Sequence, residues 1–328
     1  MKDILNYLFK DNTLNKKSAC EIMNKIANGD FTNSEIASFL TVFCMRDVTS
    51  EELSGFRESL YNLSTQIKLD SENAIDLCGT GGTGKNTFNI STISSFVVAA
   101  AGIKVIKHGN YGLSSACGSS NLLEGLGVKT ANDPNVLKGF LEKTGICFLH
   151  APLFHPAMKH IGPTRKEMGV KTIFNILGPL INPANPKFQL TGVFSERVQG
   201  LYVDVLSPIR TNYKVIYDLA GYDEVSLTSK VSIKGKKSEV LSPEDFGFSK
   251  VNPEKLVIND QESGVKLALD ILSNNADQDL INVIIANSAL AIQTVEGIDL
   301  SEAVLKAKLI IESKEAYNKL NQLLELSK

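Results

Sequence analysis

A glycine-rich stretch at residues 79–84 carries the clearest chemical signal in this sequence. Its letters, GTGGTG, place four glycines in six residues, and glycine lets a backbone turn sharply and approach an anion closely. A helix after such a turn points its free N–H groups at the same place. More hydroxyl and amide donors follow at Thr87, Asn89, Ser91 and Thr92. The stretch therefore predicts a phosphate cradle, although it lacks the Lys-Ser or Lys-Thr ending of a Walker A loop. The alternative, a tight turn that binds nothing, is disfavoured by these polar neighbours.

A second polar stretch follows the next predicted strand. It contains Lys107, His108, Gly109, Asn110, Ser114, Ser115, Ser119 and Ser120. In a parallel sheet, loops that leave the carboxyl ends of neighbouring strands meet at one crevice, where ligands bind. We therefore expect two anion-binding loops on one rim, which suits a ligand with two separated phosphate groups. Taken alone, the serine run would be typical of a flexible polar loop.

Two adjacent carboxylates, Asp223 and Glu224, follow a predicted strand at residues 214–219. Carboxylate oxygens can hold Mg²⁺ against the oxygens of a phosphate. Without other signals, such a pair more often marks a solvated turn. The pair becomes a candidate magnesium site because two phosphate loops are predicted beside it.

A histidine cluster and an arginine lie between these motifs. His150, His155 and His160 are close in sequence, but no acidic or cysteine partner stands at ligand spacing, so zinc is disfavoured. Arg165 can pair with a carboxylate through two parallel hydrogen bonds. The alternative for Arg165 is an ordinary surface arginine.

The elements that position these residues can be predicted from periodicity. Residues 1–68 show helical spacing only, with helix starts at Thr32 and Thr49, and indicate about four helices. A strand at 74–78, a helix at 91–101 and a strand at 104–107 then form a βαβ unit, which favours a parallel sheet. Later candidates are a helix at 121–126, the strand at 214–219, a β-excursion at 230–250, and helices at 264–272, 279–295 and 300–326.

Composition limits the class of protein. The chain has 328 residues, 43% of them hydrophobic, with a net charge of -2, so we expect a large domain plus a smaller one. The sequence contains no broad stripe of basic residues, and this disfavours nucleic acid as a partner. The most apolar stretch, residues 96–106, is too short to span a bilayer, and the start lacks the features of a secretory signal. The five cysteines show no paired spacing, which favours reduced thiols and a cytoplasmic location.

The motifs together resemble the anthranilate phosphoribosyltransferases, a family of tryptophan biosynthesis. The matching segments are residues 79–82, 86–92, 107–110, 114–115, 118–120, 122–124, 155–159, 172–179, 182–183, 223–224 and 243–247. They keep the family's order and spacing over nearly the whole chain.

The resemblance implies a fold and partners. It implies an α/β protein with a small all-helical domain and a large α/β domain, whose central, mostly parallel sheet is flanked by helices. Residues 1–70 would form the helical domain, joined by a segment near 165–190, and residues 71–328 the domain that binds phosphoribosyl pyrophosphate. The family also implies Mg²⁺ as cofactor, anthranilate as second substrate, and a homodimer.

The resemblance assigns the site residues as well. The residues facing phosphoribosyl pyrophosphate would be Gly79, Gly82, Thr83, Thr87, Asn89, Ile90, Ser91, Thr92, Lys107, His108, Gly109, Asn110, Ser114, Ser115 and Ser119. Gly79, Asn110, His155 and Arg165 would face anthranilate, and Ser91, Asp223 and Glu224 would serve magnesium. Arg165 would be catalytic through substrate pairing. His108 would either accept the amine proton late or pack structurally under its loop.

Three departures from the family pattern concern charge. Thr83 stands where the family has Asp, Tyr111 where it often has Arg, and Ala116-Cys117 replace a segment with a basic residue. The change at Thr83 bears on metal and pyrophosphate handling, and the other two remove positive charge near the phosphates. We therefore predict weaker affinity for phosphoribosyl pyrophosphate, with activity retained.

The reaction implied is attack of the anthranilate amine on the anomeric carbon of the ribose, with pyrophosphate leaving. One rival is a pyrimidine nucleoside phosphorylase-like enzyme of the same fold, which lacks the HPAMK and TIFNILGP segments present here. Another rival is a non-catalytic binding paralogue. It would explain the altered Thr83 and Tyr111, but not the intact Asp223, Glu224 and Arg165.

Overall fold

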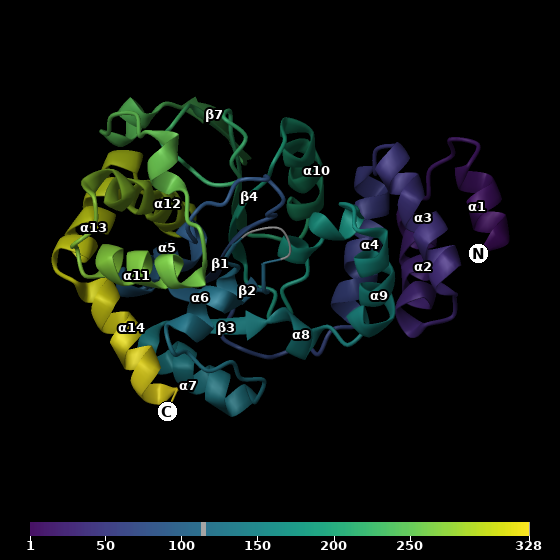
Figure 1. Cartoon of the computed structure of the whole chain (residues 1–328), viewed down its shortest axis with the longest axis horizontal. Helices are drawn as coiled ribbons and strands as arrows, with labels where there is room; N and C mark the ends of the chain where they lie inside the picture. The colour runs from purple at the N-terminus through teal and green to yellow at the C-terminus, as the bar shows by residue number, and fades with distance from the viewer. Residues whose placement is uncertain (113–115, 328) are drawn as a thin grey trace.

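The chain begins with a bundle of four helices. The computed structural model describes residues 1–112 and 116–327. The first helices are α1 (Lys2–Leu8), α2 (Lys16–Asn28), α3 (Asn33–Met45) and α4 (Ser50–Asn62). Thr32 and Thr49 each begin a helix through a capping box, because a threonine side chain satisfies a free N–H of the first turn. This helical start, at the right of Figure 1, was predicted from the sequence.

A seven-stranded sheet forms the centre of the molecule, in the order β3-β2-β1-β4-β5-β6-β7. Its strands are β1 (Ala74–Gly79), β2 (Lys104–Gly109), β3 (Ile146–His150), β4 (Phe188–Gly192), β5 (Asn212–Asp218), β6 (Val231–Gly235) and β7 (Ser238–Leu241). Neighbours from β3 to β5 are parallel, and β6 and β7 add an antiparallel edge. The predicted mostly parallel α/β fold is therefore confirmed.

Helices cover both faces of this sheet (Figure 1). On one face lie α5 (Ile90–Ala100), α7 (Pro134–Thr144), α12 (Gln278–Glu296), α13 (Leu300–Glu312) and α14 (Glu315–Leu326), which share a core with β1 to β3. Next to them are α6 (Ser119–Gly125) and α11 (Gln261–Leu272), and the remaining short elements are α8 (Ala151–Phe154) and 3₁₀ turns at Ile173–Asn175, Gly178–Leu180, Pro243–Phe246 and Pro253–Leu256. No helix within the described residues is long and apolar enough to cross a membrane.

A second core joins the bundle to the opposite face of the sheet. Phe39, Phe43 and Phe56 contact one another edge to face, with ring centroids 5.1 to 5.9 Å apart. Later parts of the chain complete this core: α9 (Met158–Met168), the stretch 173–181 and α10 (Glu196–Leu206). The site described next lies where the carboxyl ends of the strands face α9 and this stretch.

Candidate active site

The glycine stretch forms a tight loop at the carboxyl end of β1. Gly81, Gly82 and Gly84 have φ values of +64°, +73° and +74°, a conformation that glycine adopts at little cost. The Gly81 N–H donates to Oδ2 of Asp223 at 2.7 Å. A Cβ at Gly79 would lie 2.5 Å from the same oxygen, so the acidic residue packs directly on this loop.

The second loop leaves β2, the neighbour of β1, as the sequence predicted. Ser119 Oγ donates to the Asn110 carbonyl at 3.2 Å, and a Cβ at Gly109 would lie 2.2 Å from Ser119 Oγ. The loop therefore folds back tightly on the start of α6. Two residues assigned to the phosphoribosyl pyrophosphate site, Ser114 and Ser115, lie outside the described residues.

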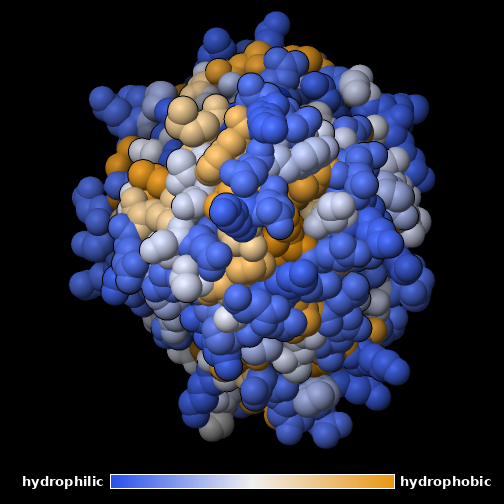
Figure 2. Space-filling model, turned by 90° about the vertical axis from the view of Figure 1, so that its right-hand side faces the viewer, coloured by the Kyte–Doolittle hydropathy of each residue, from blue (hydrophilic) through white to orange (hydrophobic). Residues whose placement is uncertain are grey.

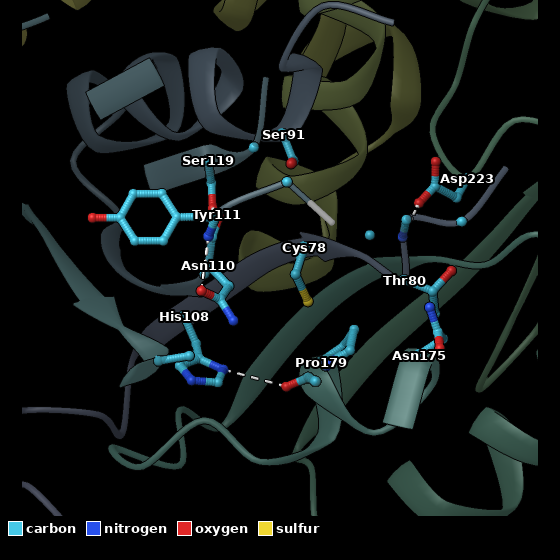
Figure 3. Close-up of a pocket in the computed structure, with 18 of the residues that line it drawn as sticks. Cys78, Thr80, Ser91, His108, Asn110, Tyr111, Ser119, Asn175, Pro179 and Asp223 are labelled. Atoms are coloured by element: carbon cyan, nitrogen blue, oxygen red, sulfur yellow. Dashed lines mark hydrogen bonds between the residues drawn. The ribbon is translucent and has the colours of Figure 1, made fainter. Parts of the chain in front are cut away.

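Both loops line one cavity of about 740 Å³. It is also lined by the other predicted site residues, namely Thr83, Thr87, Asn89, Ser91, Thr92, Lys107, His108, His155, Arg165, Asp223 and Glu224. Figure 3 shows Ser91, His108, Asn110 and Asp223 around this space. Ile90 is the exception among the described candidates: its side chain is buried in the core, and its N–H donates to the Phe88 carbonyl. We therefore withdraw its side chain as a substrate contact.

The acidic pair lies at the start of α5, beside Ser91. The Ser91 N–H donates to Oε1 of Glu224 at 2.7 Å, and Lys107 Nζ donates to Ser91 Oγ at 3.2 Å. Burial raises the pKa of Asp223, and burial together with repulsion by Asp223 raises the pKa of Glu224 to about 8. Two carboxylates held together out of water favour a cation between them.

The acidic pair is held in place by Asn287 on α12. Asn287 Oδ1 accepts the Val225 N–H at 3.0 Å, and its Nδ2 donates to the Val225 carbonyl at 2.8 Å. These two bonds fix the backbone directly after Glu224. No group of three or more His, Cys, Asp or Glu side chains that could hold a metal occurs in the described residues. The donor set of two carboxylates and the Ser91 hydroxyl still fits Mg²⁺, which usually takes one or two protein carboxylates and completes its shell with water and substrate phosphate.

His108 and His155 form a buried pair. His108 Nδ1 lies 3.2 Å from the Gly178 carbonyl (Figure 3), which can only accept, so Nδ1 carries the proton. His108 Nε2 is then the acceptor for His155 Nε2–H at 3.1 Å. Burial lowers the pKa of His108 well below its usual range and that of His155 to about 4. Both rings are therefore neutral at pH 7, and the pair favours the structural alternative for His108 over a proton acceptor.

Arg165 presents a cation to the opposite side of the cavity. Its guanidinium lies 5.1 Å from the centre of the Phe174 ring, an attractive contact for a cation. Within the described parts of the chain, no carboxylate forms an ion pair with it. An unpaired, half-buried guanidinium lining a cavity is well suited to bind a carboxylate of a ligand.

Several lining residues were not predicted from the sequence. Cys78 and Lys85 flank the glycine loop, and Thr80 lies within it. Phe174, Asn175, Gly178 and Pro179 form the wall opposite the loop. The wall residues belong to the TIFNILGP segment that carries the resemblance. The segment could be recognised in the sequence, but none of its side chains has chemistry that suggested a role in the site.

The fold and site together define a class of enzyme that holds an anionic substrate between two loops of a parallel sheet. The chain matches the helical bundle domain of a glycosyl transferase family over residues 2–64 and the family's α/β domain over residues 71–317.

Individual relatives narrow this class. The anthranilate phosphoribosyltransferase of Flavobacterium psychrophilum is 47% identical over the full length of both chains, and that of Christiangramia forsetii is 44% identical over 100% of this chain and 99% of the relative. The crystal structure of the Thermus thermophilus enzyme of that name has a TM-score of 0.92 at 29% identity, with 98% of each chain covered. This chain belongs to the anthranilate phosphoribosyltransferase family. A yeast member with the same fold, solved in complex with PRPP and Mg, has a TM-score of 0.91 at 24% identity, covering 98% of this chain and 96% of that one.

Proposed function

We propose that this chain transfers the 5-phosphoribosyl group of phosphoribosyl pyrophosphate to the amine of anthranilate and releases pyrophosphate. One observation carries the proposal: the loops that follow β1 and β2, the acidic pair and the unpaired Arg165 line a single cavity. An anionic sugar donor fits the loops, and a carboxylate-bearing acceptor fits the arginine. Membership of the family supports the same assignment.

The donor would lie across the ends of β1 and β2. The backbone N–H groups of residues 79–84 and the start of α5 are the groups that bind phosphate in such folds. The ammonium of Lys107, bonded to Ser91, adds positive charge beneath them. Holding both substrates in line is the main task, and positioning of this kind can contribute about 7 kcal/mol or more.

Mg²⁺ would be held by Asp223, Glu224 and the Ser91 hydroxyl. When bound, the ion supplies positive charge to the departing pyrophosphate. The pKa of Glu224, raised to about 8, also indicates that the pair retains a proton near neutral pH when no cation is bound. Cation binding is therefore expected to release a proton from this pair.

The acceptor would lie between Arg165 and Asn110, with His155 beside it. We infer that Arg165 binds the carboxylate of anthranilate and orients the amine toward the anomeric carbon. As the new C–N bond forms, the bond from that carbon to pyrophosphate breaks, through a transition state that resembles an oxocarbenium ion. The nitrogen then gives up one proton to solvent or to the departing pyrophosphate. An arylamine is neutral at pH 7, so attack needs no strong base, consistent with the neutral His108–His155 pair.

The test is the loss of anthranilate fluorescence on incubation with purified protein. Consumption that requires phosphoribosyl pyrophosphate and Mg²⁺ together supports the proposal. Phosphorolysis of uridine or thymidine without anthranilate consumption would instead identify a nucleoside phosphorylase. No turnover of either substrate would leave a binding paralogue.

We also propose that the helical bundle, residues 1–70 joined by residues 165–190, mediates a homodimer. Four apolar side chains on it are exposed: Tyr7 by 48%, Phe9 by 64%, Met45 by 83% and Val170 by 58%. Figure 2 shows apolar patches on the face where these helices lie. Met45→Lys should shift the sedimentation of the protein toward the monomer. Leu305→Lys, a change at an exposed apolar side chain on α13, should not.

We also propose a cytoplasmic, reducing environment, because the five cysteines show no paired spacing in the sequence.

A further inference from the structure

The strands that carry the two substrate loops, β1 and β2, stop pairing with each other before their carboxyl ends. Backbone pairing joins Ala74 to Lys104 and Ile75 to Val105. On its other side, β1 pairs with β4 as far as Gly79. On its outer side, β2 pairs with β3 as far as Gly109. The ladder between β1 and β2 is thus interrupted next to the cavity.

Three backbone groups at this interruption are paired with side chains. The His108 N–H donates to Oδ1 of Asp76 at 3.3 Å, and the Ile106 carbonyl accepts from Nδ2 of Asn182 at 2.8 Å. The Leu77 carbonyl accepts from Nζ of Lys107. In a continuing parallel ladder, such N–H and carbonyl groups would pair with the neighbouring strand.

Asp76 and Asn182 also bind each other. Asn182 Nδ2 donates to Asp76 Oδ2 at 2.9 Å, and Asn182 Oδ1 accepts the Ala184 N–H at 3.0 Å. Both side chains have no exposed surface. Asn182 uses both amide hydrogens and its oxygen, so its orientation is fully determined.

We propose that Asp76 and Asn182 are positioning residues that set the separation of the two substrate loops. They take the place of backbone pairing between β1 and β2, so β2 is held by side chains where it delivers Lys107, His108 and Asn110 to the cavity. Neither residue lines the cavity. They act on substrates only through the geometry of β2 and of the segment that carries Asn182.

The position of Asn182 strengthens this role. It follows the Gly178–Leu180 turn, whose Gly178 carbonyl accepts from His108. The same stretch of chain therefore contacts β2 at the His108 ring and at the Ile106 carbonyl. Loss of the Asn182 amide would remove one of these two contacts with β2 as well as the bond to Asp76 on β1.

The test compares Asn182→Leu with a matched control, Gln199→Leu. Gln199 is also fully buried, and its Nε2 donates to two backbone carbonyls, those of Val215 and Ser232, at 2.9 Å each. Gln199 does not line the cavity. Each change removes an amide that donates to two buried acceptors. For Asn182 these are the Asp76 carboxylate and the Ile106 carbonyl, and for Gln199 they are two carbonyls, so both variants should lose thermal stability.

We expect only Asn182→Leu to lose catalytic efficiency. Its kcat/KM should fall at least tenfold, since misplacement by about 1 Å can cost about a hundredfold in rate. Gln199→Leu should stay within about twofold of the unchanged protein. Asp76→Asn keeps the volume of the side chain but places an amide N–H group where an acceptor is needed. Its kcat/KM should therefore fall as that of Asn182→Leu does. Equal losses in the Asn182 and Gln199 variants would overturn the proposal.

Hydrogen exchange gives a readout that does not depend on activity. Amides of residues 104–109 should exchange faster in Asn182→Leu and Asp76→Asn, and should be unchanged in Gln199→Leu. Unchanged exchange in all three would also overturn the proposal. The expected loss of kcat/KM rests on the proposed function, whereas the role of Asp76 and Asn182 in spacing the two loops does not. If the unchanged protein proved inactive, the proposed function would fail, while the exchange result would still decide the role of the pair.

Discussion

Replacement of Arg165 by glutamine should weaken anthranilate binding selectively. The guanidinium lines the cavity, stacks on Phe174 and forms no ion pair with a carboxylate within the described residues. Its charge is therefore available to the ligand. The donor-binding loops lie on β1 and β2, so the change should leave binding of phosphoribosyl pyrophosphate nearly intact.

The size of the effect follows from the energy of a charged hydrogen bond. Such a bond contributes about 1.5–3 kcal/mol, and each 1.4 kcal/mol is about tenfold. The KM for anthranilate should rise by about 10- to 150-fold. Arg165→Lys should give an intermediate value, because lysine keeps the charge but loses the planar pair of donors.

Steady-state kinetics with each substrate varied in turn measures this effect. Lys166→Ala, the next residue on α9 and exposed, serves as control and should change neither constant. Far-UV circular dichroism establishes that the variants are folded. Equal increases in the KM of both substrates, or an anthranilate KM within twofold of the original, would refute the assignment of Arg165 to the carboxylate.

Three further outcomes follow from the same geometry. Glu224→Gln or Asp223→Asn should raise the Mg²⁺ concentration needed for half-maximal rate by at least about tenfold; an unchanged titration would remove the pair from the metal site. The KM for phosphoribosyl pyrophosphate should exceed the low micromolar range, and Tyr111→Arg should lower it severalfold by adding a charged phosphate contact; a low micromolar KM for the unchanged protein would contradict the weakened cradle. Burial lowers the pKa of His155 from 6.5 to about 4, so its contribution to stability is present above pH 6.5 and is lost as the pH falls toward 4. Between pH 7 and pH 5 this costs about 2 kcal/mol of unfolding free energy, and urea titrations of His155→Gln should show a smaller loss over that range.

Much of the fold could be predicted because local signals agreed with tertiary structure. Thr32 and Thr49 begin helices as expected, and the apolar run ending at the glycine turn became β1. Strand β4 was missed because two of its five residues, Gln189 and Thr191, are buried polar side chains that interrupt the apolar pattern. Their hydrogen bonds are made by residues distant in sequence, so no local pattern could reveal them.

In the candidate site, too, only residues with a local sequence signal could be predicted. Residues with strong chemical character, such as Arg165 and Asp223, were identified from type and spacing together with the family resemblance. Asp76 was not singled out, since a single acid in a predicted strand carries no signal until its partner Asn182 is known. Ile90 was assigned from its place in a motif and not from its side-chain chemistry, and its side chain is buried in the core and does not line the cavity. The pairing of His155 with His108 became visible only when two distant loops were placed together.

The second core has a consequence for synthesis of the protein. The apolar faces of the N-terminal helices belong to a core that includes residues as late as Val215. A ribosome adding about 5–20 residues per second needs about 8 to 30 s to travel from the end of α4 to that point. Throughout this interval the amphipathic faces of α2, α3 and α4 are finished but lack their final partners. The nascent bundle must therefore be protected by its own partial packing, or by a chaperone, until the middle of the sheet has emerged.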